Sequence, residues 1–519
     1  MPHRTNTAHF NSSQASNYSS RKKGREEELY VLPANPVRKP EIMRDDFLFL
    51  PVEDSAKRLL YPKTFLILGF LVLIGLAILK VTGNFFGVGM LVALVGAIEI
   101  LYVVLMVFKL YVVYRSVDTP FYNVSAEELA TLKDEDLPIY TILIPLYREE
   151  QVIQQIIAAM SALDYPPEKL DIIITLEEYD HQTISAIEQS RAPRYFKTLI
   201  LPNVNPKTKP KALNVALLKA RGEFLVIYDA EIVPDADQLK KAVYTFRKYG
   251  DMGVLQTRLD HYNKEQNILT KLFNTEFSFY YDMFLPGLED LKFPIPLSGH
   301  STHFRMNVLE EIGGWDPYNV TEDCDVGMRV ARQGIRTGIL DSASQEEATS
   351  TIKSWIMQRT RWMKGFIQTS IVHLRNPIQF TREIGGLRNL MAFLLLVPVA
   401  VIINFLNLFF WILFIFWVTV QPVFVQDLYP GPVLYMSVTA FIIGNIIFTL
   451  LNLLGSYGRA RYSLVKYGLL SPIYWILLAV AATRALVQVV TSPHSWEKTK
   501  HGGHLTAGID ALGARARQV

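Results

Sequence analysis

The stretch EFLVIYDA at residues 223–230 decides the fold, because it is a short apolar run that ends at an acidic turn. Three similar β-rich runs precede it: YTILIPLY at 140–147, LDIIITL at 170–176 and FKTLILP at 196–202. Helical patterns separate these runs, and strands that alternate with helices predict βαβ units and a largely parallel sheet. Ligands bind at the carboxyl ends of the strands in such sheets. Asp229 lies at one of these ends.

Apolar runs flank this α/β region on both sides. Residues 64–81 and 85–111 are each long enough for a membrane span, which needs about 20 residues. Basic residues before the first run and after the second predict that both flanks are cytoplasmic. Further runs follow at 389–419, 432–454 and 468–490.

The later runs leave the number of spans open. We expect 389–419 to combine an interfacial helix, up to about Pro398, with one true span. The basic tail after residue 490 favours the inside, so 468–490 is expected to lie in the cytoplasmic interface. This gives four spans; the alternative, in which 389–419 crosses twice, gives six.

These patterns divide the chain into five parts. They are a disordered, basic cytoplasmic tail (1–60), two transmembrane helices (61–115), an α/β domain that ends in amphipathic interfacial helices (116–385), two or more transmembrane helices with interfacial or re-entrant helices (386–490), and a cytoplasmic tail (491–519).

Composition excludes several classes of protein. Of 519 residues, 50% are hydrophobic and the net charge is only +3, which argues against nucleic-acid binding by bulk electrostatics. The single cysteine, Cys324, excludes an intrachain disulfide and a cysteine-based zinc site.

Two acidic motifs carry candidate chemistry. Asp229 and Glu231 follow a buried strand, and paired carboxylates there can hold Mg²⁺ or Mn²⁺ through oxygen. Such an ion would neutralise a diphosphate leaving group. Thr321-Glu322-Asp323 opens a helical segment, and Asp323 is a candidate general base for an acceptor hydroxyl. A helix cap is the alternative role for Thr321 or Asp323.

Three other segments carry candidate binding groups. Gln358, Arg361 and Trp362 lie on one helical surface, where Arg can pair with a diphosphate and Trp can stack on a sugar. The alternative is an ordinary interfacial helix. The basic segment 206–214 opens a helix and favours an anion such as phosphate; the alternative is a solvated basic loop. Three acids follow the second strand: Glu177, Glu178 and Asp180. They would either contact the uracil or ribose of a nucleotide or form a solvated turn.

Together these motifs resemble the processive membrane-bound synthases of glycosyltransferase family 2, such as cellulose synthase, hyaluronan synthase and related bacterial exopolysaccharide synthases. The resemblance extends from about residue 60 to 505 and implies a GT-A-type cytoplasmic catalytic domain inserted in an α-helical transmembrane bundle with interfacial helices. The chain departs from the family pattern in two motifs. The usual Asp-Asp-Gly is here Glu-Glu-Tyr-Asp, and the D-x-D is D-x-E.

The resemblance also implies residue roles. Asp229 and Glu231 would contact the sugar nucleotide and its metal, and Asp323, with Glu322 beside it, would be catalytic. Substrate-binding roles are implied for Lys211 at the diphosphate, for Gly299 and Ser301 near the acceptor, and for Gln358, Arg361 and Trp362 at the acceptor end and diphosphate. The tail segment WEKTKH (496–501) resembles a gate over the substrate, formed by Trp496, Lys498, Thr499 and His501; a basic membrane anchor is the alternative.

We therefore expect an inverting, metal-dependent polysaccharide synthase in a bacterial inner membrane, with its catalytic domain in the cytoplasm. It would add a sugar from a UDP-sugar, by resemblance glucose and otherwise N-acetylglucosamine, to a β-linked glycan that it secretes. Accessory secretion proteins are possible partners, and no nucleic acid is expected. The alternatives are a non-processive transferase that acts on a lipid-linked acceptor, and a transporter or receptor that binds its ligand without releasing UDP.

Overall fold

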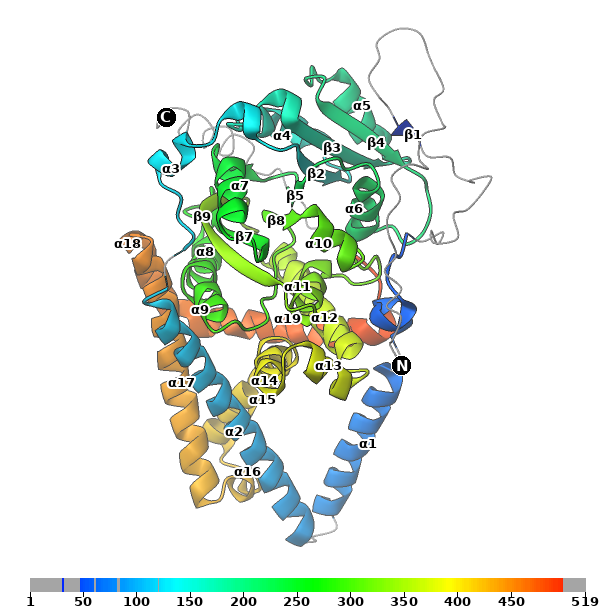
Figure 1. Cartoon of the computed structure of the whole chain (residues 1–519). Helices are drawn as coiled ribbons and strands as arrows, with labels where there is room; N and C mark the ends of the chain where they lie inside the picture. The colour runs from blue at the N-terminus through cyan, green and yellow to red at the C-terminus, as the bar shows by residue number, and fades with distance from the viewer. Residues whose placement is uncertain (1–29, 32–46, 60–61, 82–84, 120, 498–519) are drawn as a thin grey trace, which may run out of the picture.

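A mixed sheet forms the centre of the α/β region (Figure 1). The structure is a computed structural model, and it describes residues 30–31, 47–59, 62–81, 85–119 and 121–497. In these residues the strand order is β1-β4-β3-β2-β5-β8-β7-β9-β6. The strands are β1 (Tyr30–Val31), β2 (Tyr140–Leu146), β3 (Leu170–Glu177), β4 (Phe196–Leu201), β5 (Phe224–Ile227), β6 (Val233–Pro234), β7 (Met252–His261), β8 (Thr302–Arg305) and β9 (Arg336–Glu346).

The two halves of the sheet have different pairing. Strands β4, β3, β2 and β5 are parallel neighbours, as the four apolar runs predict. Strand β8 is antiparallel to both β5 and β7, and β9 then pairs with β7 in parallel. The carboxyl ends of β2, β3 and β5 therefore meet at one edge, which is where acidic residues follow the strands.

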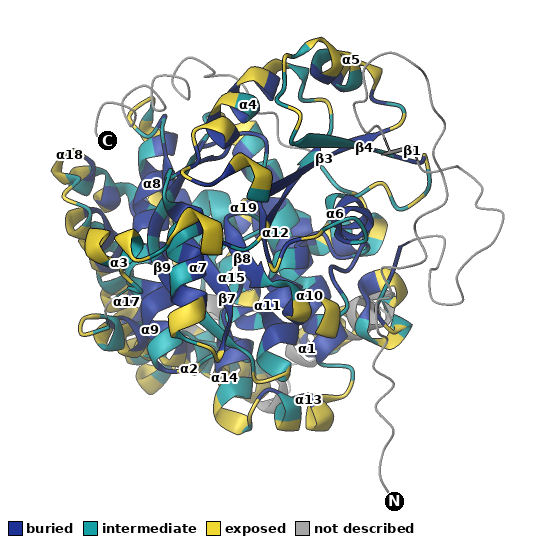
Figure 2. Cartoon of the chain, turned by 45° about the horizontal axis from the view of Figure 1, so that its top comes forward, coloured by how far each residue is buried: buried dark blue, intermediate teal, exposed yellow. Residues whose placement is uncertain are grey.

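Helices cover both faces of the sheet. Figure 2 shows buried strands below helices such as α4 and α5, whose outer surfaces are exposed. The helices of this region are α3 (Ala126–Ala130), α4 (Ile153–Ser161), α5 (His181–Gln189), α6 (Lys209–Leu217), α7 (Gln238–Lys248), α8 (Ile268–Phe279), α9 (Leu285–Asp290), α10 (Met306–Glu311), α11 (Glu322–Arg332), α12 (Ile352–His373) and α13 (Pro377–Glu383).

Long apolar helices form a bundle on one side of the α/β region (Figure 1). Within the described residues, four helical stretches are long and apolar enough to cross a membrane: 89–116, 387–420, 431–458 and 462–491. The helices are α1 (Pro62–Val81), α2 (Phe85–Ser116), α14 (Leu387–Leu396), α15 (Pro398–Val420), α16 (Val423–Leu428), α17 (Gly431–Gly458), α18 (Tyr462–Val465) and α19 (Ser471–Thr491).

Two details of the bundle bear on the expected spans. The break expected near Pro398 is present, because α14 ends at Leu396 and α15 begins at Pro398. Helix α19 lies between the α/β region and the other membrane-length helices. It runs across the bundle rather than alongside α2 and α17 (Figure 1). Its orientation is that of an interfacial helix, although its length and composition also suit a span.

The structure corrects the boundary of the N-terminal tail. Residues 47–59 were included in the disordered part, but Leu48 and Ala56 are buried. Asp316 fixes this segment, since its carboxylate accepts hydrogen bonds from Ser55 Oγ (2.8 Å) and from the backbone amide of Ala56 (2.6 Å). The partner lies about 260 residues away in the chain, so local sequence pattern carries no sign of it.

Candidate active site

One cavity of about 860 Å³ joins the sheet edge to the helical bundle. Leu146, Glu177 and Asp229, from the ends of β2, β3 and β5, line one part of it. Trp362 of α12 and Trp475 of α19 line another part. The cavity is near the upper end of the usual range for small-molecule sites, about 300–1,000 Å³, so it has room for more than one sugar unit.

Lys209 and Asp229 form an ion pair in the cavity wall. Lys209 is the first residue of α6, and its Nζ lies 2.6 Å from Asp229 Oδ1. The same ammonium donates to the backbone carbonyl of Gly299 at 2.7 Å. Burial lowers the pKa of Lys209, but Asp229 and Glu322 together raise it above its usual value. Lys209 is therefore a fixed cation among acids.

Asp229 and Glu231 provide two carboxylates, which is enough to bind a hard divalent ion when other ligands complete its shell. Both line the cavity. No cluster of three or more His, Cys, Asp or Glu side chains suited to a metal occurs in the described residues. Mg²⁺ commonly binds through one or two carboxylates and completes its shell with substrate phosphates and water. The two residues therefore fit an ion that arrives with a diphosphate.

The three acids after β3 separate in space. Glu177 lines the cavity, whereas Glu178 and Asp180 do not. Asp180 instead caps α5, accepting from the backbone amides of Thr183 and of Arg148. Of the three candidates for nucleotide contact, Glu177 is thus the one at the cavity.

Lys211 does not reach the cavity, contrary to the role implied by the resemblance. Its side chain is fully buried, and Nζ lies 2.9 Å from Glu177 Oε1. Burial lowers the pKa of Lys211 and raises that of Glu177, and each partner opposes the effect on the other. Lys209, two residues earlier, has the cavity position. Two residues correspond to about 200° around a helix, so the two lysines leave α6 on opposite sides.

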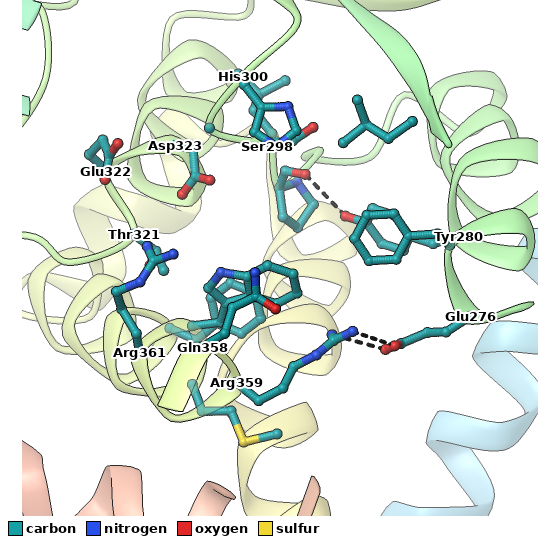
Figure 3. A pocket seen from close by; sticks show the side chains of 18 of the residues that line it. Glu276, Tyr280, Ser298, His300, Thr321, Glu322, Asp323, Gln358, Arg359 and Arg361 are labelled. Atoms are coloured by element: carbon teal, nitrogen blue, oxygen red, sulfur yellow. Dashed lines mark hydrogen bonds and ion pairs between the residues drawn. The ribbon is translucent and has the colours of Figure 1, made fainter. Parts of the chain in front are cut away.

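Asp323, the candidate general base, lies at the cavity. It lines the cavity in the first turn of α11, with His300 and Ser298 on the same side and Gln358 and Arg359 on the other (Figure 3). A Cβ at Gly299 would lie 3.0 Å from Asp323 Oδ2, so this loop backbone lies close to the carboxylate. Burial raises the pKa of Asp323 above its usual value.

Helix α12 brings Gln358, Arg361 and Trp362 to the cavity together. The helix packs tightly on the loop before α11, since a Cβ at Gly365 would lie 1.9 Å from Thr321 Oγ1. Arg361 points toward the side of the cavity that holds Asp323 (Figure 3). The motif therefore shares one cavity with both acidic motifs.

Arg359 is a residue of this motif that the sequence did not single out. Its guanidinium makes a bidentate ion pair with Glu276 of α8, at 3.1 and 2.5 Å (Figure 3). It also stacks on Trp362, with Cζ 4.3 Å from the ring centroid. A cation so held fixes the plane of the indole on which a sugar can stack. In the sequence, the signal that could have identified Arg359 is its position between Gln358 and Arg361.

The segment that follows α19 reaches the same cavity through Trp496. Its ring lies 5.8 Å from Arg361 Cζ, and it lines the cavity. Lys364 of α12 holds the preceding backbone by donating to the carbonyl of Ser495 at 2.5 Å. Lys498 and Thr499, which were expected beside Trp496, lie outside the described residues, as does His501.

The loop 299–301 divides its residues between cavity and core. Gly299 lines the cavity, whereas Ser301 is buried and lies outside the lining. His300, which lies between these two residues in the chain, does line the cavity, and so does Glu346 at the end of β9. Neither was a candidate from the sequence: His300 lies between the candidates Gly299 and Ser301, and Glu346 is far in the chain from the motifs.

Residues 224–425 match a known family. The matching model is that of glycosyl transferase family group 2. This segment contains Asp229, Asp323 and Arg361, so the matched domain carries most of the cavity's charged groups. The match spans less than half of the chain, so this segment is similar to family 2 glycosyltransferases. The predicted α/β domain beside apolar helices is confirmed.

Individual relatives are distant. The chain is 27% identical over 235 residues to the probable glycosyltransferase YdaM of Bacillus subtilis, and the match covers 44% of this chain and 56% of that relative's length. Among solved structures, a mannosyltransferase from Pyrobaculum calidifontis in complex with GDP-Man and Mn²⁺ is similar at a TM-score of 0.46 and 16% identity, covering 77% of this chain and 98% of that one. Staphylococcus aureus TarS 1-349 with UDP-GlcNAc is similar at a TM-score of 0.36 and 14% identity, covering 70% and 97%.

Proposed function

We propose that this protein is an inverting, metal-dependent UDP-sugar glycosyltransferase that extends a β-linked glycan and passes it into the helical bundle. The observation that carries the proposal is the continuity of one cavity. The same space is lined by Asp229, Asp323 and Arg361 and by residues of the membrane-length helices. Glucose from UDP-glucose is the proposed donor, and the proposed location is a bacterial inner membrane with the catalytic domain in the cytoplasm.

The reaction is a single displacement. Asp323 takes the proton of the acceptor hydroxyl as its oxygen attacks the anomeric carbon of the donor. The bond between that carbon and the diphosphate oxygen breaks, and UDP leaves. Arg361 and Lys209 face the diphosphate and stabilise its growing charge. A Mg²⁺ or Mn²⁺ ion held by Asp229 and Glu231 would supply further neutralisation of the leaving group.

Acceptor binding is assigned to α12. Trp362 offers a flat apolar face for the terminal sugar of the growing chain, and Arg359 holds that face in place. Since attack on one face of the anomeric carbon inverts it, an α-linked donor gives a β-linked product.

The bundle end of the cavity has the chemistry of a glycan path. Four asparagines line it among apolar and aromatic side chains: Asn404, Asn407, Asn445 and Asn452. A glycan carries many hydroxyls, and these need hydrogen-bond partners where water is scarce. A path for a lipid acceptor alone would not need amides. The amides therefore favour polymer extension over transfer to a lipid-linked acceptor.

Replacing these amides shortens the product. We expect the double variant Asn404→Leu with Asn445→Leu to reduce mean product length by at least about tenfold, since two lost hydrogen bonds of about 1 kcal/mol each weaken glycan binding by about thirtyfold. The initial rate of UDP release stays near that of the wild type. Product length is measured by size-exclusion chromatography.

A matched control is Thr419→Leu on α15. Thr419 is exposed and, like Asn404, bonds a carbonyl of its own helix, but it is not among the lining residues. Equal product lengths in the double variant and the wild type would contradict the proposed path.

The acid limb of the pH profile follows from burial. Burial raises the pKa of Glu322 to about 7, with Lys209 opposing it, and also raises that of Asp323 beside it. A raised pKa means that the carboxyl is protonated at mildly acidic pH, and a protonated base cannot accept the hydroxyl proton. We expect kcat to fall on the acid side of the pH profile, measured as UDP release at saturating donor. A kcat that stays constant down to pH 5 would contradict this assignment.

The function is tested with purified protein in lipid nanodiscs. UDP release is measured with UDP-glucose, UDP-galactose, UDP-N-acetylglucosamine and UDP-glucuronate, each with Mn²⁺ or Mg²⁺. The product is sized and digested with linkage-specific hydrolases. Metal-dependent conversion of one donor into a long polymer supports the proposal, whereas a single sugar added to a lipid supports the non-processive alternative. Binding of a ligand without UDP release would favour a transporter or receptor.

A further inference from the structure

A buried carboxylate beside the reaction centre is shared by two histidines. Glu346 ends β9 and lines the cavity. Its Oε1 lies 3.1 Å from His261 Nε2, and its Oε2 lies 3.0 Å from His300 Nε2. The proposed reaction uses none of these three groups, although burying a carboxylate is costly unless it is paired.

The surrounding contacts fix the tautomer of His261. The side-chain amide of Asn274 donates to Asp260 Oδ1 at 2.9 Å and lies 3.0 Å from His261 Nδ1, while its oxygen accepts from Arg461 at 2.7 Å. A carboxylate only accepts and a guanidinium only donates, so the amide has one orientation. His261 Nδ1 therefore accepts, and its proton is on Nε2, which faces Glu346.

The same reasoning extends to His300. Burial raises the pKa of Glu346, but the two histidines lower it below its usual range, so Glu346 is ionised and can only accept. His300 must then carry a proton on Nε2. Its other nitrogen, Nδ1, is buried and has no hydrogen-bond partner among the described residues. An unpaired buried nitrogen costs free energy that a substrate hydroxyl would recover.

The position of the loop indicates which part of the substrate His300 faces. The carbonyl of Gly299, next to His300, accepts from Lys209, and its Cα lies against Asp323. Lys209 and Asp229 belong to the diphosphate side of the cavity, and Asp323 to the acceptor side. The sugar that is transferred must lie between the two, and the loop bridges that gap.

We propose that His300 determines donor specificity, with Nδ1 bonding a ring hydroxyl of the sugar in the UDP-sugar. Glu346 and His261 are positioning residues, which hold the imidazole through a buried chain that begins at Arg461. The inference rests on the proposed function, because it requires a nucleotide sugar in the cavity.

Two substitutions separate the nitrogens of His300. Asparagine places a polar atom near the position of Nδ1 and loses the contact with Glu346. Glutamine reaches the position of Nε2, keeps Glu346 paired and removes Nδ1. We expect His300→Gln to bind the preferred UDP-sugar at least about tenfold more weakly, as for one lost hydrogen bond, with UDP affinity unchanged. His300→Asn stays closer to the wild type. Titration calorimetry in nanodiscs measures both affinities.

The opposite ranking would overturn the proposal. If His300→Gln binds the UDP-sugar as the wild type does, or His300→Asn is the weaker binder, the histidine serves only to pair Glu346. Monodeoxy UDP-sugars give a second measurement that needs no stable variant: one analogue must bind the wild type about tenfold more weakly, and equal affinity for all of them rejects the contact. A wild type that binds UDP but no UDP-sugar overturns the proposed function, and the inference with it.

Discussion

Asp323→Asn is expected to reduce kcat by about 10²- to 10⁴-fold, the usual contribution of a general base. Asparagine has nearly the shape of aspartate and preserves the acceptor for the backbone amide of Cys324, at 2.8 Å, so the start of α11 stays intact. It cannot take a proton from the acceptor hydroxyl. The donor KM should change little, because the groups assigned to the diphosphate are Lys209, Asp229 and Arg361.

The measurement is UDP release across a donor titration, with the melting temperature recorded for each protein. Glu178→Gln is the matched control, since it also converts a carboxylate to an amide but lies outside the cavity and should keep full activity. Full turnover by Asp323→Asn would exclude the base assignment. A raised donor KM with unchanged kcat would instead place Asp323 on the donor.

The sequence predicted the first half of the sheet because β2, β3, β4 and β5 are buried parallel strands and hence continuous apolar runs. It did not predict the second half. Strand β9, with the sequence RTGILDSASQE, mixes polar and apolar residues, and its pairing with β7 depends on contacts distant in the chain. Strand β8, which is antiparallel to its neighbours β5 and β7, shows no local signal of its own.

The site was predictable where a motif orders several side chains. Asp229, Glu231, Asp323, Gln358, Arg361 and Trp362 all line the cavity. It was not predictable where a single position decides the direction of a side chain. Ser301 has a positive φ of 56°, which turns the chain and leaves His300 rather than Ser301 at the cavity. The sequence Gly299-His300-Ser301 contains no pattern that shows which of these residues lines the cavity.

The two lysines of α6 provide the sharpest test of what the structure adds. We expect Lys209→Met to lower kcat/KM for the UDP-sugar by about 10²- to 10³-fold, the scale on which one electrostatic stabiliser of developing charge acts. Its ammonium neutralises Asp229 and lies near Glu322 and Asp323. Without it, a diphosphate would meet three acidic groups with one cation fewer.

Lys211→Met should behave differently, although it removes the same charge from the same helix. Its partner Glu177 would be left as an uncompensated, largely buried carboxylate, a change that typically destabilises a protein by about 3–5 kcal/mol. We therefore expect a lower melting temperature but a kcat/KM per folded enzyme near that of the wild type. The reverse result, with donor turnover lost in Lys211→Met and retained in Lys209→Met at equal stability, would return the diphosphate contact to Lys211. Because both lysines lie within one turn of a helix, a difference between the variants can come only from the direction in which each side chain leaves it.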